Sequence, residues 1–334
     1  MESNLIQQEL FDVLKSRIPS TSSLADDIAG ILSISADSAY RRIRGEKAVS
    51  IDELYKLCTY YKVSIDQLMS IQTDAFVFTG QFINYKTFRF DEYLANIGKY
   101  MSQMSSFEDK HFYYLCKDIP FAHIYHFREI AAFKYYFWMR TILHMPEFAT
   151  KKVDLNEYPD ELFQLGVKSL ELYNQFDTYE LWNLESLNST IRQIDFYSDS
   201  QLFQSAEDAW LVYDAVDKLI THLEKQAEKG YKFKYGDEKM NPLGKFHFYF
   251  NELLLLDNTM YVEFNNRRIV YMVNSGVNFM STRDIRFCNN MHDYIHNLMR
   301  KSTLLSSVNE KERLRFFNRL KEKIHGRKQA LSRG

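Results

Sequence analysis

Two groups of histidine, cysteine and acidic side chains have types and spacings that could bind a metal ion. They are His123, His126 and Glu129 in one segment, and Cys288, His292 and His296 in another. On a helix, neighbouring members of the second group share a face, but its outer two lie about 12 Å apart along the axis. No Cys-x-x-Cys pair and no His-Glu-x-x-His sequence accompanies them. We therefore expect no metal site, because buried or surface histidines are the simpler interpretation.

The chain also lacks the glycine-rich loops that hold nucleotide phosphates. Neither a Gly-x-Gly-x-x-Gly sequence nor a loop ending in Gly-Lys-Ser/Thr occurs. An enzyme would need paired titratable groups in a pocket, and no such pair is recognisable along the chain. We expect no catalytic residues, no cofactor and no enzymatic activity.

A third group of side chains has the chemistry that reads double-stranded DNA. Its members are Ser35, Asp37, Ser38, Arg41, Arg42, Arg44 and Lys47. Arginine can bind guanine through two hydrogen bonds, and small hydroxyls reach base edges or phosphates. Asp37 could accept a hydrogen bond from cytosine N4, or it could cap a helix. Residues 1–72 carry a net charge of −2, but the run from Arg41 to Lys47 carries +3.

Five short helices must position this third group. Apolar residues recur at helical spacing, and a serine- and threonine-rich run before residue 24 supplies N-caps. A three-residue break at 33–35 separates the second and third helices, and Gly45 ends the third. Ser50 and Glu53 form a capping-box pattern at the start of the fourth. The expected helices cover about 5–18, 24–32, 36–44, 51–61 and 63–68.

The residues of these helices carry a family resemblance over about residues 5–70. The segments concerned are Ile28-Ala29, Leu32-Ser33-Ile34-Ser35, Tyr40 to Lys47, and Ser50 to Leu54. They resemble the lambda-repressor-like (Cro-type) helix-turn-helix domain of bacterial transcription regulators. The resemblance implies a sequence-specific DNA-binding regulator whose third helix reads the major groove. Because a lone small domain buries too little surface for tight specific binding, we also expect a homodimer on a repeated half-site.

Helix geometry divides the third helix into two faces. At 100° per residue, the expected packing face is Ala36, Ala39, Tyr40 and Ile43. The expected DNA face is Ser38 and Arg41, flanked by Asp37 and Arg44. Arg42, Arg44 and Lys47 are better placed for phosphates than for bases. The alternative function is a helical interaction scaffold whose N-terminal domain docks a protein partner.

The rest of the chain is expected to form a larger regulatory domain. We assign residues 1–71 to the helix-turn-helix domain, 72–80 to a connector, and 81–334 to a mostly helical region for dimerisation. Sensing of a small molecule or a protein effector is left open. Helices are expected at about 90–105, 107–117, 127–144, 159–174, 178–197 and 204–229. The many aromatic residues there favour a helical core with large side chains over an aromatic ligand pocket.

A change of pattern near residue 245 predicts a small antiparallel β-meander over 245–273. Phe246, Phe248 and Phe250 alternate with polar residues, and Asn265-Asn266 suits a hairpin turn. Two further helices are expected, to about residue 300 and over about 309–324. Residues 300–334 carry a net charge of +8 against −8 in the middle of the chain. This basic tail either contacts phosphates or, as we favour, packs against the acidic middle region.

Composition sets the class of the whole chain as mainly α. Its 334 residues include only 11 Gly and 5 Pro, which disfavours turn-rich β folds, and 16% aromatics, which excludes disorder. Three widely spaced cysteines favour a reducing compartment. No signal peptide and no apolar run of membrane-spanning length is recognisable. We therefore expect a cytoplasmic protein.

Overall fold

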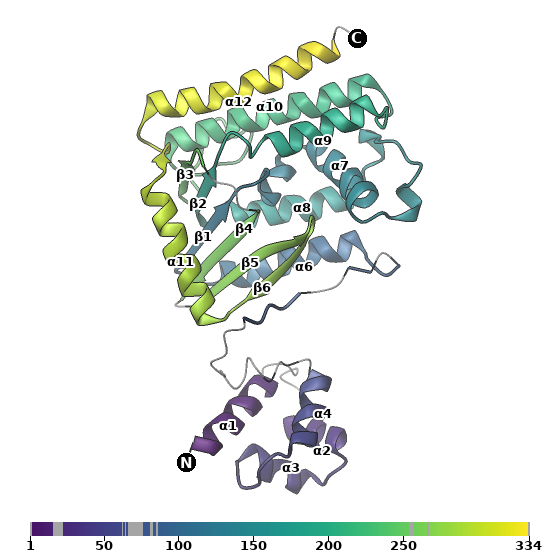
Figure 1. Cartoon of the computed structure of the whole chain (residues 1–334), viewed down its shortest axis with the longest axis vertical. Helices are drawn as coiled ribbons and strands as arrows, with labels where there is room; N and C mark the ends of the chain where they lie inside the picture. The colour runs from purple at the N-terminus through teal and green to yellow at the C-terminus, as the bar shows by residue number, and fades with distance from the viewer. Residues whose placement is uncertain are drawn as a thin grey trace. The chain divides into compact units, whose positions relative to one another are not determined.

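The computed structural model describes residues 2–15, 23–61, 63, 65, 76–80, 83–84, 86–253, 257–265 and 267–332. The chain forms two compact units, Met1–Val77 and Phe78–Gly334. Helices dominate both units, and the second unit also contains a β-sheet, so the predicted mainly α class is confirmed (Figure 1).

The first unit contains four helices among its described residues. They are α1 (Glu2–Lys15), α2 (Leu24–Leu32), α3 (Ala36–Ile43) and α4 (Ile51–Tyr61). Leu14, Ile28, Ala39 and Leu57 come from the four different helices and are fully buried together in the core. The four helices predicted up to residue 61 match these elements. The fifth, predicted over 63–68, lies mostly outside the described residues.

The second unit alternates helices with strands. Its main elements are α6 (Phe90–Ser105), β1 (Lys110–Leu115), η1 (Phe121–His126), α7 (Arg128–Phe137), which continues as η2 (Trp138–Ile142), α8 (Asp160–Tyr173), β2 (Asp177–Trp182), α9 (Asn188–Asp199), α10 (Ala206–Lys229), β3 (Phe246–Phe250), β4 (Thr259–Phe264), β5 (Arg267–Ser275), β6 (Asn278–Thr282), α11 (Ile285–Arg300), β7 (Thr303–Leu304) and α12 (Glu310–Leu331). Two short 3₁₀ turns, η3 (Pro146–Phe148) and η4 (Leu155–Glu157), precede α8.

The described strands form one seven-stranded mixed sheet in the order β6-β5-β4-β1-β2-β3-β7. The central strands β1, β2 and β3 are parallel, whereas β4, β5 and β6 form an antiparallel meander beside β1. The sheet is therefore larger than the predicted meander. The predicted strand at 246–250 exists, but it pairs with β2 and β7 rather than with its neighbour in sequence.

Two segments predicted as helices are strands. Residues 110–115 form β1 and residues 177–182 form β2, where helices over 107–117 and 178–197 were expected. Both strands are central in the sheet, and four consecutive residues of β1, from Phe112 to Leu115, are buried. A strand buried on both faces shows an apolar run rather than alternation, so its period cannot be told from that of a helix.

Each face of the sheet has its own core. Phe112, Trp182 and Phe248 belong to the larger core, which the sheet shares with helices such as α8 and α10. Tyr113, Leu181 and Tyr261 point to the opposite face, where Cys288 and Ile295 of α11 cover them. Figure 1 shows α11 lying along the strands. Most of the aromatic side chains thus fill the core, as we favoured.

Candidate nucleic-acid interface

The turn between α2 and α3 is built from three consecutive serine and isoleucine residues. Ser33 ends α2 in the left-handed conformation, with φ 56°, and Ile34 N–H donates back to Ala29 O at 3.0 Å. Ser35 then begins α3, because its Oγ accepts a hydrogen bond from Ser38 N at 3.3 Å. A helix end and a helix start in three residues fix the angle between α2 and α3.

The outward face of α3 carries most of the residues predicted to contact DNA. Asp37, Arg41 and Arg44 are exposed on α3 and at its end, and the side chains of Arg41 and Arg44 are 52% and 59% accessible. Ser35 is exposed at the start of the helix and Lys47 in the loop that follows it. Five of the seven predicted residues are therefore available to a ligand from outside. Ser38 is half-buried.

The packing face of α3 is rotated from the predicted one. Ala39 is fully buried and Ile43 is half-buried, but Tyr40 is 50% exposed and Ala36 is exposed. Tyr40 therefore belongs to the outward face with Asp37 and Arg41, which corrects its placement on the packing face. We placed Tyr40 on the packing face because its ring is apolar. A tyrosine can also lie at the surface, where its hydroxyl and ring edge are presented to a partner.

Arg42 is the predicted phosphate contact that the structure places elsewhere. It is 3% exposed and forms a two-pronged ion pair with Glu53 of α4, with Nη2 at 2.6 Å and Nε at 3.1 Å from the carboxylate oxygens. Its remaining Nη1 donates to Ser38 O at 3.1 Å. A guanidinium buried in this way is not available to phosphate. The sequence signal that points to this pair is Glu53, an acidic residue in the first turn of α4.

Glu53 also completes the predicted capping box of α4. Its carboxylate accepts from Ser50 N at 3.0 Å, and Ser50 Oγ accepts from Glu53 N at 3.2 Å. The hydrogen bonds from Arg42 and Ser50 lower the pKa of Glu53, against the effect of its partial burial. The Glu53 carboxylate therefore caps the N-terminus of α4, where the loop after α3 ends, and it also holds α3 against α4.

Gln7 of α1 fixes the other side of that loop. Its amide Nε2 donates to Arg42 O at 2.7 Å and to Lys47 O at 2.9 Å, while its Oε1 accepts from Val49 N at 3.1 Å. These three bonds join α1 to both ends of the 42–49 segment. Sequence reasoning did not single out Gln7, because a polar residue on an amphipathic helix gives no sign of a partner forty residues away.

The two exposed arginines share a carboxylate in the free chain. Glu46 lies 2.9 Å from Arg44 Nε and 3.9 Å from Arg41 Nε. All three side chains are about half accessible, so these pairs are weak and can exchange for a phosphate or a base.

Comparison with known proteins supports a helix-turn-helix assignment for this unit. Residues 2–79 match the family model described as BetR domain, a helix-turn-helix-type regulatory domain. The match covers less than a quarter of the chain, and we use the name BetR domain below only as a label for residues 2–79. No curated protein and no solved structure matched the chain. The Cro-type subfamily remains a prediction.

Outside the BetR domain, the structure gathers buried polar side chains that the sequence leaves apart. His123 Nε2 lies 2.8 Å from Glu180 Oε1, and Tyr173 and Trp182 donate to the same carboxylate at 2.6 and 2.8 Å. Burial by itself would raise the pKa of Glu180, but the neighbouring His123 and these donors lower it. All four side chains are buried, so the cluster ties η1 and α8 to β2.

His126 and His222 extend this cluster to α10. The ring centroids of His123 and His126 are 5.7 Å apart, and those of His126 and His222 are 4.8 Å apart. Burial lowers the pKa of His126 and that of His222, the latter to about 4. Among the described residues, no three His, Cys, Asp or Glu side chains are arranged to hold a metal ion.

The other histidine and cysteine group stays on one helix. On α11, Cys288 is buried with its Sγ 3.6 Å from Arg268 O, and the rings of His292 and His296 are 4.1 Å apart. The His292 ring lies against Tyr261 of β4 and the His296 ring against Tyr113 of β1, so Cys288 and the two rings pack against the strands.

No described helix is both long and apolar enough to span a membrane.

The basic C-terminal segment packs against acidic residues of its own unit. Helix α12 lies alongside α10 (Figure 1). Ion pairs between α12 and the preceding helices include Lys321–Glu224, Arg327–Asp195 and Lys328–Asp214, and His325 Nε2 lies 3.0 Å from Asp217 Oδ2. This arrangement is the one we favoured for the tail, and it pairs Lys321, Arg327 and Lys328 with acids of the same unit.

Proposed function

We propose that the chain is a sequence-specific DNA-binding transcription regulator whose α3 reads the major groove. The observation that carries this proposal is the outward face of α3, which presents Arg41 and Arg44 beside Asp37 and Tyr40. An α-helix fits the major groove, and these side chains offer the donors, acceptors and apolar surface that distinguish base pairs there. The BetR match supports a regulatory helix-turn-helix for the same residues.

The side chains of this face have different roles in the proposed complex. Arg41 binds guanine, and Asp37 accepts from cytosine N4. The Tyr40 ring contacts a thymine methyl group. Arg44, Lys47 and the Ser35 end of α3 contact phosphates, because cations and helix N-termini favour anions.

Replacing Arg41 with alanine tests the reading helix. If Arg41 reads a base, Arg41→Ala costs about 1–3 kcal/mol of specific binding and relaxes the preference at one position of the site. Footprinting and a titration by fluorescence anisotropy measure both effects, on the DNA site that genomic-fragment selection with the wild-type chain recovers. Equal binding by Arg41→Ala and the wild type removes Arg41 from the interface.

A matched control removes the same charge from the other unit. Arg315 is an exposed arginine of α12, paired with Glu312 at 3.9 Å. Arg315→Ala should leave the affinity and the base preference as in the wild type. If both variants lose affinity to the same degree, the effect of Arg41→Ala comes from net charge and not from reading.

We assign the second unit to dimerisation, with sensing of a small molecule or protein effector as a further role, and no enzymatic activity. Genomic-fragment selection with the purified full chain tests symmetry and function together. Recovery of an inverted repeat supports a dimer, since half-site symmetry mirrors protein symmetry. Recovery of random fragments would contradict sequence-specific binding.

Salt separates this function from the alternative of a protein-docking scaffold. DNA binding releases counterions, so its affinity should fall steeply as salt rises. Docking through apolar helix faces should change little over the same range.

A further inference from the structure

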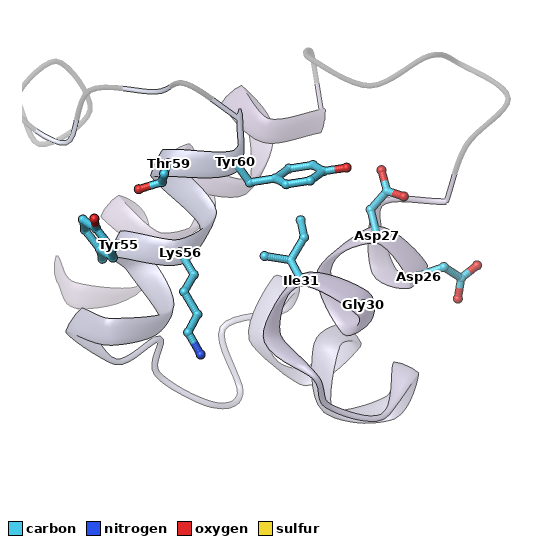
Figure 2. A pocket seen from close by; sticks show the side chains of 8 residues that line it. All are labelled: Asp26, Asp27, Gly30, Ile31, Tyr55, Lys56, Thr59 and Tyr60. Carbon is cyan, nitrogen blue, oxygen red and sulfur yellow. The ribbon is translucent and has the colours of Figure 1, made fainter.

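An open groove lies between α2 and α4 of the BetR domain and takes no part in the proposed DNA face. It has a volume of about 630 Å³. Figure 2 shows the residues that line it, which are Asp26, Asp27, Gly30 and Ile31 of α2 and Tyr55, Lys56, Thr59 and Tyr60 of α4. None of them belongs to α3, so the groove and the outward face of α3 can be occupied together.

The α4 wall of the groove exposes large apolar side chains. Tyr55 and Tyr60 are 67% and 63% exposed, and Ile51, one turn before Tyr55, is 85% exposed. Ile31 adds an aliphatic side chain from α2, and it lies between the two walls in Figure 2. Apolar and aromatic side chains gathered in the open are typical of a protein-binding surface.

Opposite charges flank this apolar middle. Asp26 and Asp27 stand in the first turn of α2, and Lys56 stands on α4, with Ile31 between them in Figure 2. A surface with acid on one side and base on the other is complementary to itself under a two-fold rotation. Such a rotation places Lys56 of each copy against Asp26 and Asp27 of the other.

Gly30 gives an independent sign of a close approach. A helix that contains glycine is less stable than the same helix with alanine at that position. A Cβ at Gly30 would meet no atom of the described residues within 4 Å, and Gly30 has no positive φ that would require glycine. Nothing in the folding of the described residues therefore favours glycine there, whereas a partner packed closely on α2 would.

We propose that this groove binds the same groove of a second copy of the chain. The contact goes beyond the proposed function, because it joins two BetR domains with or without DNA. Eight residues on each side are fewer than the roughly 20–30 of a standard interface. The contact is therefore weak by itself and forms when two copies are held near each other.

Crosslinking of the full chain measures the contact directly. Thr59→Cys places a thiol on the α4 wall of the groove, and the native Cys58, Cys116 and Cys288 are buried. Treatment with a short bismaleimide should yield a covalent dimer from Thr59→Cys chains and not from the wild type. A yield no higher than that of the wild type overturns the proposal.

Charge exchange between two copies then tests the two-fold arrangement. In Thr59→Cys chains, Asp26→Lys alone and Lys56→Glu alone each place like charges opposite one another, so each should lower the crosslinking yield about fivefold. An equal mixture of the two variants restores opposite charges in the mixed dimer and should recover most of the yield. A mixture that crosslinks no better than either variant alone contradicts the proposal.

A variant of Gly30 separates the contact from folding. Gly30→Leu fits the open space in the free chain and has better helix propensity, so the BetR domain should unfold at a higher urea concentration. In Thr59→Cys chains, the same side chain blocks the close approach and should lower the crosslinking yield at least fivefold. Unchanged crosslinking by Gly30→Leu overturns the proposal, even if a charge variant fails to fold.

Discussion

Arg42 shows how a single residue links the architecture of the BetR domain to its exposed face. Its guanidinium is buried and bonded to Glu53 and to the backbone, while Arg41 and Arg44 on either side point outward. Because the pKa of Glu53 is lower in the folded state, the pair stabilises the fold above the ordinary pKa of the carboxyl. That contribution disappears as the pH falls through the lowered value.

Arg42→Ala should destabilise the BetR domain by about 3 kcal/mol, because it leaves the Glu53 carboxylate partly buried without its partner. Hydrogen exchange of α3 and α4 peptides in the full chain, followed by mass spectrometry, measures this loss. Arg44→Ala is the control: its exposed pair with Glu46 should contribute less than about 0.5 kcal/mol. Equal effects of the two variants would contradict the structural role of Arg42.

The contact between η1 and α10 shows how an element can carry a pH dependence. The rings of His126 and His222 lie beside one another, with centroids 4.8 Å apart, and desolvation lowers the pKa of both. A histidine with a lowered pKa in the folded state takes up protons more readily when unfolded. Its neutral form therefore stabilises the fold fully above pH 6.5, and this contribution is lost as the pH falls toward the folded value.

The second unit should lose stability between about pH 6.5 and pH 4, by up to about 3 kcal/mol through His222. Trp138, Trp182 and Trp210 all belong to this unit, so tryptophan fluorescence in urea reports on it alone. His222→Gln should flatten the slope, whereas replacing the exposed His144 of the same unit with Gln should change it little. A slope unchanged by His222→Gln would remove the histidine contact as its cause.

At the scale of the whole molecule, the basic residues of the two units differ in what they contact. Three cations of α12, Lys321, Arg327 and Lys328, pair with acids of α9 and α10. Lys328 lies between Asp214 and Asp217 and 4.7 Å above the Trp210 ring. In the part of the first unit that the structure describes, Arg41 and Arg44 pair with Glu46, and Arg42 pairs with Glu53. A net charge of −2 for the chain therefore hides a local basic face in the BetR domain.

Lys328→Ala should weaken the second unit by about 1 kcal/mol and leave DNA affinity within about twofold of the wild type. Lys47→Ala should lower affinity for all sequences alike and reduce the salt slope by about one. Urea unfolding and DNA titrations at several salt concentrations measure the two effects. A Lys328→Ala variant that binds DNA as weakly as Lys47→Ala would place α12 at the DNA.

The amino-acid sequence by itself determined the local features of this protein. The caps at Ser35 and Ser50, the helix ends at Ser33 and Gly45, and the outward direction of Arg41 all follow from groups within about four residues of one another. Helical hydrogen bonds and capping act over that range, so their residue types are legible along the chain.

Only the tertiary structure decided the features that depend on distant partners. Arg42 is buried because Glu53 comes from another helix, and β1 is a strand because β2 and β4 pair with it from 66 to 154 residues away. The meeting of His222 with His126 depends on α10 packing against η1. The type of a side chain and the period of a segment are the same whether or not a distant partner packs against it. The burial of Arg42, the strand β1 and the histidine contact therefore depend on the packing of the folded chain.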